Sequence, residues 1–151
     1  MKITDILQET CVRVPLQATD TLGAITELVE LLDGTGRLSD RDVVLRAVLA
    51  REETRSTGIG HGLAVPHGKS HGCRELVMAV GKPSTPIDFQ AVDGKPCEFV
   101  VLVASPADKT GPHIQALAGI ARLWLNDEFR GAIAQAGTAD ELYAAIRQHQ
   151  R

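Results

Sequence analysis

Residues 97–104 read Cys-Glu-Phe-Val-Val-Leu-Val-Ala, and the run from Phe99 to Val103 contains only large apolar side chains. Such a continuous run is typical of a central strand that is covered on both faces. Residues 75–82 form a second β-rich stretch, and the Asp93-Gly94 pair between the two stretches predicts a turn. This part of the chain therefore predicts a buried sheet.

Two helical patterns precede these strands. Apolar residues recur at three and four positions over residues 21–33, and Gly34 can supply a left-handed stop. Ser39 and Asp42 predict a capping box for a second helix over residues 40–53. The first of these two helices is amphipathic.

Three more helices are expected after the strands. One begins near Pro112, which suits the first helical position, and its expected inward face is Ile114, Leu117, Ala118, Ala121, Trp124 and Leu125. Shorter helices are predicted over residues 127–136 and 139–147, and Thr138 with Glu141 forms a capping box for the last.

The alternation of strands and helices predicts an α/β fold built in layers. With 151 residues, 44% of them apolar and 23% charged, the composition is that of an ordinary globular domain. Because no repeat or linker-like tract interrupts the pattern, residues 1–151 are expected to form a single domain.

Charge and hydropathy exclude several functional classes. The formal charge is −3 without a run of like charges, which disfavours nucleic-acid binding. The longest strongly apolar run, Phe99 to Ala104, is far too short for a membrane span, and the N-terminal residues turn acidic at Asp5 without the apolar core of a secretion signal. A cytoplasmic protein that is not embedded in a membrane is expected. Its three dispersed cysteines, Cys11, Cys73 and Cys97, suit reduced thiols.

The most unusual stretch is residues 57–69, Thr-Gly-Ile-Gly-His-Gly-Leu-Ala-Val-Pro-His-Gly-Lys. Leu63-Ala64-Val65 reads as a short strand, because Pro66 biases the preceding residue toward extended geometry and withdraws an amide donor. His67 is then expected in a loop just beyond the end of that strand. A loop just after a strand end can expose such a histidine.

Three kinds of site are compatible with this stretch. A phosphate-binding P-loop would need four residues between its glycines, whereas five separate Gly62 from Gly68, so nucleotide binding is disfavoured. A metal site could draw on His61, His67 and His71, but their spacing matches no common zinc pattern and no paired cysteine joins them. No metal or other cofactor is therefore expected.

The third kind of site uses His67 as a nucleophile, because a neutral imidazole is available near pH 7. Such a site needs groups that stabilise an anion. Arg51 lies near the end of the second predicted helix, and His113 lies at the start of another, where amide donors and the helix dipole attract anions. A phosphoryl group would suit this setting.

These residues also carry a family resemblance. The chain resembles enzyme IIA domains of the fructose/mannitol type, which belong to the bacterial phosphoenolpyruvate-dependent sugar phosphotransferase system and include a nitrogen-regulatory branch. The resemblance extends over essentially the whole chain. It is carried by Arg51-Glu52, Ser56 to Gly60, Gly62 to Lys69, Thr85 to Phe89, Asp93 to Pro96, Pro106 to Asp108, His113, Leu117 and Asp140 to Leu142.

The resemblance implies a mixed β-sheet flanked by helices and a role for each site residue. His67 would be the phosphoacceptor, Arg51 would contact the phosphoryl group, and His113 would be the second active-site histidine. His61 occupies a position that the motif leaves open, so no role is carried over to it. Thr57 could donate its hydroxyl to phosphate, although a turn-stabilising role is the simpler interpretation.

The implied function is that of a cytoplasmic phosphocarrier. The phosphoryl donor would be the HPr phosphocarrier protein, and the acceptor would be a IIB domain in sugar uptake. In regulation, the phosphorylation state would instead control binding to target proteins. A non-catalytic interaction domain, which would carry no phosphohistidine, and a histidine-based metal-binding protein are the alternatives.

Overall fold

The apolar stretches of the sequence come together in one mixed sheet. The computed structural model describes residues 1–150. Its strands run in the order β1-β5-β6-β3-β2, and β4 also pairs with β6. The strands are β1 (Leu7–Leu16), β2 (Gly58–Gly60), β3 (Leu63–Ala64), β4 (His67–Lys69), β5 (Val77–Pro83) and β6 (Phe99–Ser105).

Strand β6 lies at the centre of the sheet, and every one of its residues is buried, which confirms the central strand predicted from residues 97–104. It runs antiparallel to β5, with Ala79 opposite Leu102, and parallel to β3 and β4 on its other edge. The Asp93-Gly94 turn is also confirmed, because Gly94 has a φ of 72° and donates its amide to the carbonyl of Ala91.

The prediction that His67 lies in a loop was wrong. Val65 and Pro66 only interrupt the strand, and His67 begins β4 opposite Val103 of β6. The carbonyl of Pro66 still accepts a hydrogen bond from the amide of Val103, so the chain stays attached to β6 across the interruption. His67 is consequently held by the sheet rather than by a flexible connection.

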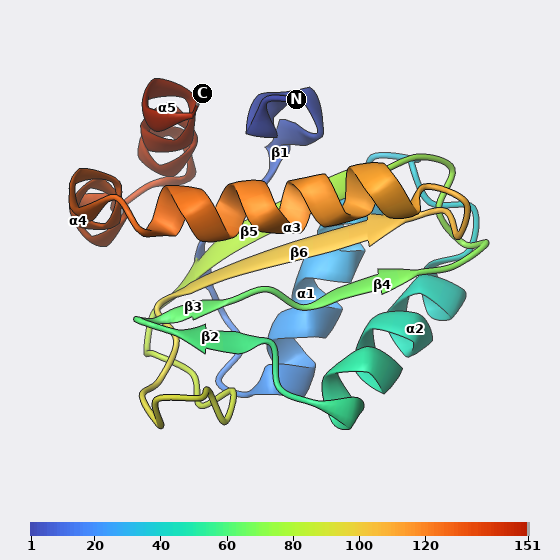
Figure 1. Ribbon diagram of the computed structural model, residues 1–151, viewed down its shortest axis with the longest axis horizontal. Helices are drawn as coiled ribbons and strands as arrows, with labels where there is room; N and C mark the ends of the chain where they lie inside the picture. The colour runs from blue at the N-terminus through green and yellow to red at the C-terminus, as the bar shows by residue number, and fades with distance from the viewer. Residues whose placement is uncertain (151) are drawn as a thin grey trace.

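Helices cover both faces of this sheet (Figure 1). Helix α3 runs along β6 on one face, whereas α1 lies on the other face behind β5 and β6, and α2 packs against α1 and β4. The helical elements are the short 3-10 helix η1 (Ile3–Asp5), α1 (Thr21–Asp33), α2 (Arg41–Thr54), α3 (Thr110–Trp124), α4 (Asp127–Gln135) and α5 (Ala139–His149). None of them is both long and apolar enough to cross a membrane.

Strand β1 was not predicted. Its residues Gln8, Glu9 and Thr10 are exposed and polar, so the segment lacks the apolar pattern of a strand. It forms because β5, some seventy residues later in the chain, offers an open edge on which β1 pairs in parallel. Helix α5 then packs on β1, which ties the end of the chain to its beginning.

The predicted helix ends needed local corrections. Gly34 has an ordinary helical φ of −63°, and the left-handed residue is Gly36. Asp40, not Ser39, caps α2 by accepting a hydrogen bond from the amide of Val43. Thr138 caps α5 through the amide of Glu141, as predicted. These differences move the capping residues by a position or two and leave the helices in place.

The prediction of which side of α3 faces the core was partly wrong. The helix begins at Thr110, two residues before Pro112, and it buries His113, Ala116, Ile120 and Trp124. Ile114 is 58% exposed and Leu125 is 73% exposed. Trp124 stacks on Phe99 of β6 with a centroid distance of 5.3 Å, which confirms its place in the core. The rotation of α3 turns His113 inward and leaves apolar side chains on its outer side.

All three cysteines are buried free thiols. Burial raises the pKa of Cys73 to about 11 and that of Cys97 to about 12. Protonated, buried thiols of this kind act as small apolar side chains in the core.

Candidate functional site

His67 is fixed with one ring nitrogen engaged and the other free. Its Nδ1 lies 2.8 Å from the carbonyl oxygen of Val65, which can only accept, so Nδ1 carries the proton. Nε2 then holds a lone pair, and the half-buried ring lines a cavity of about 530 Å³. Burial lowers the pKa of His67 below its ordinary value, and the nearby Arg51 lowers it further, against the hydrogen bond to Val65. A neutral, nucleophilic Nε2 results at neutral pH.

Gly68 explains how α2 comes so close to His67. A Cβ atom at Gly68 would lie 3.0 Å from the amide nitrogen of Val48 and 3.1 Å from the carbonyl carbon of Ala47. Only glycine therefore lets the backbone of β4 touch the backbone of α2 without displacing it. This contact sets the position of the last turns of α2 beside His67.

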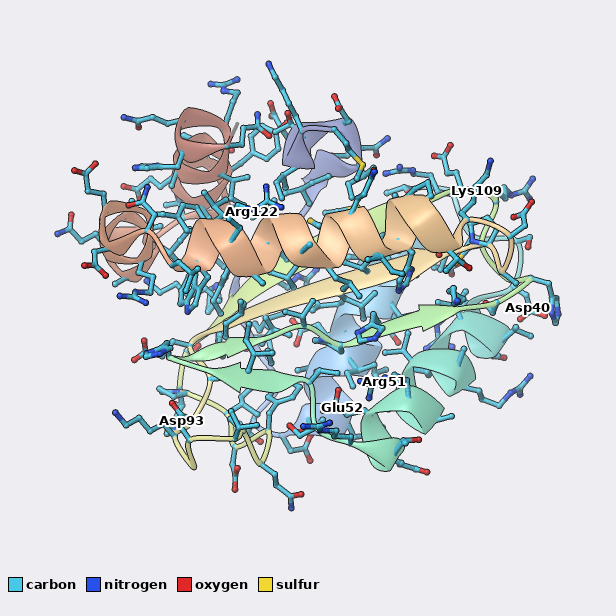
Figure 2. All side chains as sticks on the ribbon, in the orientation of Figure 1. Asp40, Arg51, Glu52, Asp93, Lys109 and Arg122 are labelled. Carbon is cyan, nitrogen blue, oxygen red and sulfur yellow. The ribbon has the colours of Figure 1, made fainter. Side chains whose placement is uncertain are left out.

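Arg51 lies in those last turns and lines the same cavity as His67. Figure 2 shows Arg51 and Glu52 together at the end of α2. One guanidinium nitrogen of Arg51, Nη1, donates to the carbonyl of Arg55 at 2.8 Å. The planar guanidinium has other N–H groups that this bond does not use, and they suit the oxygens of a phosphoryl group.

Glu52 holds the turn that follows α2. Its carboxylate accepts hydrogen bonds from the Thr57 amide at 2.8 Å and from the Thr57 hydroxyl at 2.6 Å. The hydroxyl of Thr57 is thus engaged and buried, which favours the turn-stabilising interpretation. Glu52 stabilises the segment that leads into β2 and, through β3, to His67.

His113 comes from the opposite side of the site, in the first turn of α3. Its ring centroid lies 5.5 Å from that of His67, with the two planes at 63°. It is only 4% exposed, and within residues 1–150 its Nε2 has no hydrogen-bond partner. Burial, reinforced by repulsion from the His67 ring when that ring is protonated and from the Lys69 ammonium, lowers its pKa to about 4. Burial is therefore the main reason that His113 is neutral.

Ser105 is a site residue that the sequence analysis missed. It is fully buried at the end of β6, and its Oγ lies 2.7 Å from Nδ1 of His113. The hydroxyl either donates to an unprotonated Nδ1 or accepts from a protonated one. When Ser105 donates, His113 carries its proton on Nε2, the nitrogen that has no hydrogen-bond partner within residues 1–150. A serine after an apolar strand gives no sequence signal of this contact.

The other histidines of the glycine-rich stretch lie outside this cluster. His61 is exposed, with a φ of 56°, and its carbonyl accepts a hydrogen bond from Trp124 Nε1 at 3.0 Å. His71 is exposed, and Lys69 extends to the Thr110 hydroxyl at 3.2 Å. Across residues 1–150, no group of three histidine, cysteine or carboxylate side chains is arranged to hold a metal ion.

The rim of the His67 cavity is apolar and exposed. Ile59, Val92 and Ile114 are among the large hydrophobic side chains most exposed to solvent, and all three line this cavity. They come from β2, from the turn before β6 and from α3. Apolar side chains gathered around a polar centre are typical of a surface that contacts another protein.

Comparison with known proteins shows the family to which the chain is similar. The family model described as "Phosphoenolpyruvate-dependent sugar phosphotransferase system, EIIA 2" matches residues 5–149. The chain is 31% identical over 151 residues to the fructose-specific EIIABC component of Bacillus subtilis, of which it spans only 24%. It is 31% identical over 149 residues to the nitrogen regulatory protein of Escherichia coli, and this match covers 97% of the chain and 90% of that protein.

Solved structures show the same fold. The nitrogen regulatory protein IIA-Ntr of Neisseria meningitidis superposes with a TM-score of 0.86 at 27% identity, over 95% of this chain and 98% of that one. The IIA mannitol enzyme in its complex with phosphorylated IIB from Escherichia coli superposes with a TM-score of 0.79 over 95% of this chain and 99% of that one. At 17% identity, the latter likeness concerns the fold alone.

Proposed function

This chain belongs to the EIIA 2 family of the phosphoenolpyruvate-dependent sugar phosphotransferase system, and from that membership we propose that it is a phosphoryl carrier with His67 as the acceptor. The observation that carries the proposal is the hydrogen bonding of the ring nitrogens of His67 and His113. Nδ1 of His67 is engaged by Val65, which leaves Nε2 free in a cavity shared with Arg51. The ring of His113 faces that of His67, and its Nε2 has no hydrogen-bond partner within residues 1–150.

The proposed step exchanges one phosphorus–nitrogen bond for another. The lone pair of His67 Nε2 attacks the phosphorus of a phosphohistidine on an HPr-like donor, and the bond to the donor nitrogen breaks, which returns that electron pair to the donor ring. Positive charge grows on the His67 ring, and the Val65 carbonyl at Nδ1 stabilises it. Arg51 and His113 Nε2–H would donate to the phosphoryl oxygens. The site would therefore mainly position the phosphoryl group and neutralise its negative charge. The reverse sequence passes the group onward.

The exposed apolar rim supports protein partners for both half-reactions. Ile59, Val92 and Ile114 line the same cavity as His67, and a protein that docks there would exclude water from the transfer. A phosphorylated HPr-like protein is the proposed donor. A IIB component or a regulatory target is the proposed recipient, and we place the exchange in the cytoplasm.

Regulation is a second candidate outcome because the chain is 31% identical to a nitrogen regulatory protein of Escherichia coli, the same identity that it has to the fructose-specific component of Bacillus subtilis. A transfer assay separates the two. The phosphorylated protein is mixed with purified IIB domains of fructose and mannitol type, and the transfer of label to each is followed. Transfer at rates comparable to uptake systems supports sugar transport. Retention of the label, with binding to a target that changes on phosphorylation, supports regulation.

Replacing His113 by alanine should still allow a phosphohistidine to form at His67, but transfer should slow by about a hundredfold, as expected for the loss of one preorganised donor. Rapid quench would measure the rates from phosphorylated HPr and to an acceptor separately. His113→Gln, whose amide can donate near the same position, should recover part of the rate. His61→Ala is the matched control, because His61 lies outside the cavity.

Wild-type rates in His113→Ala would remove His113 from the transfer. Label on His113 itself in the wild-type protein would reverse the roles proposed for the two histidines. Circular dichroism of each variant checks that the loss of a buried ring has not unfolded α3.

Replacing Ser105 by alanine should alter the protonation of His113 rather than the fold. Without the hydroxyl at Nδ1, nothing favours the tautomer with the proton on Nε2, and the two tautomers should mix. Ring ¹⁵N chemical shifts report this mixture directly. We expect onward transfer to slow by about threefold to tenfold, the usual worth of one neutral hydrogen bond. Unchanged ¹⁵N shifts in Ser105→Ala would show that Ser105 does not set the tautomer.

A further inference from the structure

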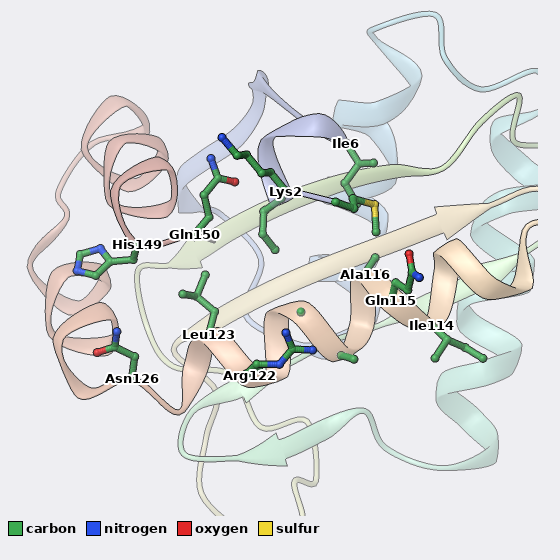
Figure 3. Close-up of a pocket in the computed structure, with 14 residues that line it drawn as sticks. Lys2, Ile6, Ile114, Gln115, Ala116, Arg122, Leu123, Asn126, His149 and Gln150 are labelled. Carbon is green, nitrogen blue, oxygen red and sulfur yellow. The ribbon is translucent and has the colours of Figure 1, made fainter.

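A second cavity, of about 560 Å³, lies on the other side of α3 from the His67 cavity. Figure 3 shows it between α3, the N-terminal segment with η1, and the end of α5. Its size is within the range of small-molecule sites. The phosphoryl transfer proposed above makes no use of it.

Hydrogen bonds between distant parts of the chain hold the walls of this cavity. The Gln150 side chain accepts from the Thr4 amide at 2.9 Å and donates to the Thr4 hydroxyl at 2.8 Å. These two bonds tie the end of α5 to η1 across the cavity. Ile3 and Ile6 of η1 and its flank, with Ala116 and Leu123 of α3, give an apolar interior.

The charged lining of this cavity is entirely basic. Lys2 and Arg122 line it, and no aspartate or glutamate among residues 1–150 does, although the protein as a whole has a formal charge of −3. Among residues 1–150, no carboxylate lies within ion-pair distance of Arg122, and the nearby Asp5 accepts a hydrogen bond from the Lys2 amide. Figure 3 shows Arg122 at the edge of the cavity on α3, across from Lys2.

From this combination we propose that the cavity binds a small organic anion with an apolar body. Its carboxylate or sulfonate group pairs with Arg122, whose guanidinium suits a planar or branched oxyanion. The apolar body packs on Ile3, Ile6 and Leu123, where its burial supplies most of the affinity. A free small acid, rather than a macromolecule, fits a pocket of this volume.

This site is separate from the phosphate site although the two share a wall. Ile114 and Ala118 line both cavities, because α3 stands between them. Gly119 and Arg122 line only the new cavity, whereas Arg51 and His67 line only the other. Mutations of Gly119 and Arg122 therefore test the proposal without touching the phosphoryl-transfer residues.

The test uses 1-anilinonaphthalene-8-sulfonate, a sulfonate with an aromatic body whose fluorescence rises in apolar surroundings. Titration of the wild-type protein should saturate at one site, and Arg122→Gln should weaken the affinity about tenfold or more. Arg46→Gln, which removes the same charge from an exposed position on α2, should leave the affinity unchanged. Amide chemical shifts map the probe, and changes are expected in η1, around Gly119 and at the end of α5.

A second variant fills the cavity. A Cβ atom at Gly119 would have no neighbour closer than Ile3 Cδ1 at 4.0 Å, so Gly119→Leu can project into the space without a backbone clash. Leucine is also a better helix former than glycine, which protects the fold. This variant should lose saturable binding of the probe. Undiminished affinity in either Arg122→Gln or Gly119→Leu, or shift changes centred on His67, would overturn the proposal.

Discussion

Replacement of His67 by alanine is expected to abolish phosphorylation. Incubation of the wild-type protein with phosphoenolpyruvate, enzyme I and HPr should add one acid-labile phosphate, detected by mass spectrometry, and the variant should gain none. The reason is geometric: the described structure offers one half-buried imidazole with its Nδ1 already engaged and its Nε2 in the cavity beside Arg51. His61→Ala and His71→Ala are the matched controls and should be labelled like the wild type.

The rate of phosphorylation should also fall as the pH is lowered. Burial lowers the pKa of His67 below its ordinary 6.5, so the ring is neutral at pH 7 and above and its Nε2 lone pair is available. Acidification through the lowered pKa protonates that nitrogen, and the rate of labelling should fall there. Buffers that raise the pH above 7 should change the intrinsic rate little.

Persistent labelling of His67→Ala, or a phosphate mapped to His61 or His71, would contradict the assignment. Circular dichroism distinguishes loss of chemistry from loss of fold. His67 is half-buried at the start of β4 rather than enclosed in the core, so the variant is expected to fold. A folded, unlabelled variant together with an unlabelled wild type would favour the non-catalytic interaction domain.

Replacement of Arg51 by lysine is expected to slow phosphorylation about tenfold or more, equivalent to about 1.4 kcal/mol of transition-state stabilisation. Lysine keeps the positive charge but loses the planar fork. In the structure, Nη1 of Arg51 is anchored on the Arg55 carbonyl at 2.8 Å, which orients the rest of the guanidinium. An ammonium group cannot keep this anchor and also offer two parallel donors to a phosphoryl group.

The measurement is the single-turnover rate of phosphoryl transfer from HPr, with Arg46→Lys on the same helix as the control. Arg46 is exposed on α2 and lies outside the His67 cavity, so its variant should behave like the wild type. A wild-type rate in Arg51→Lys would restrict Arg51 to a structural role at the end of α2. Thermal unfolding of both variants would show whether the Arg55 contact also contributes to stability.

The sequence was sufficient for features that depend on neighbouring residues. Helix α1 follows from its apolar period, and β6 follows from the run Phe99 to Val103. The turn at Asp93-Gly94 and the cap at Thr138 also follow, because each is formed by residues a few positions apart. The motif around His67 indicated the family for the same reason, because the residues of this motif lie close together in the chain.

Tertiary structure decided what depends on distant residues. Strand β1 exists because β5 offers an edge to a segment whose first half is mainly polar, and His67 lies in a strand because β6 pairs with it across the Val65-Pro66 interruption. The side of α3 that faces the sheet depends on how Trp124 stacks on Phe99. That packing buries His113 and brings it against Ser105. Local sequence determines which element forms, through backbone preference and apolar period, but the pairing of sheet edges and the packing of side chains determine which residues meet.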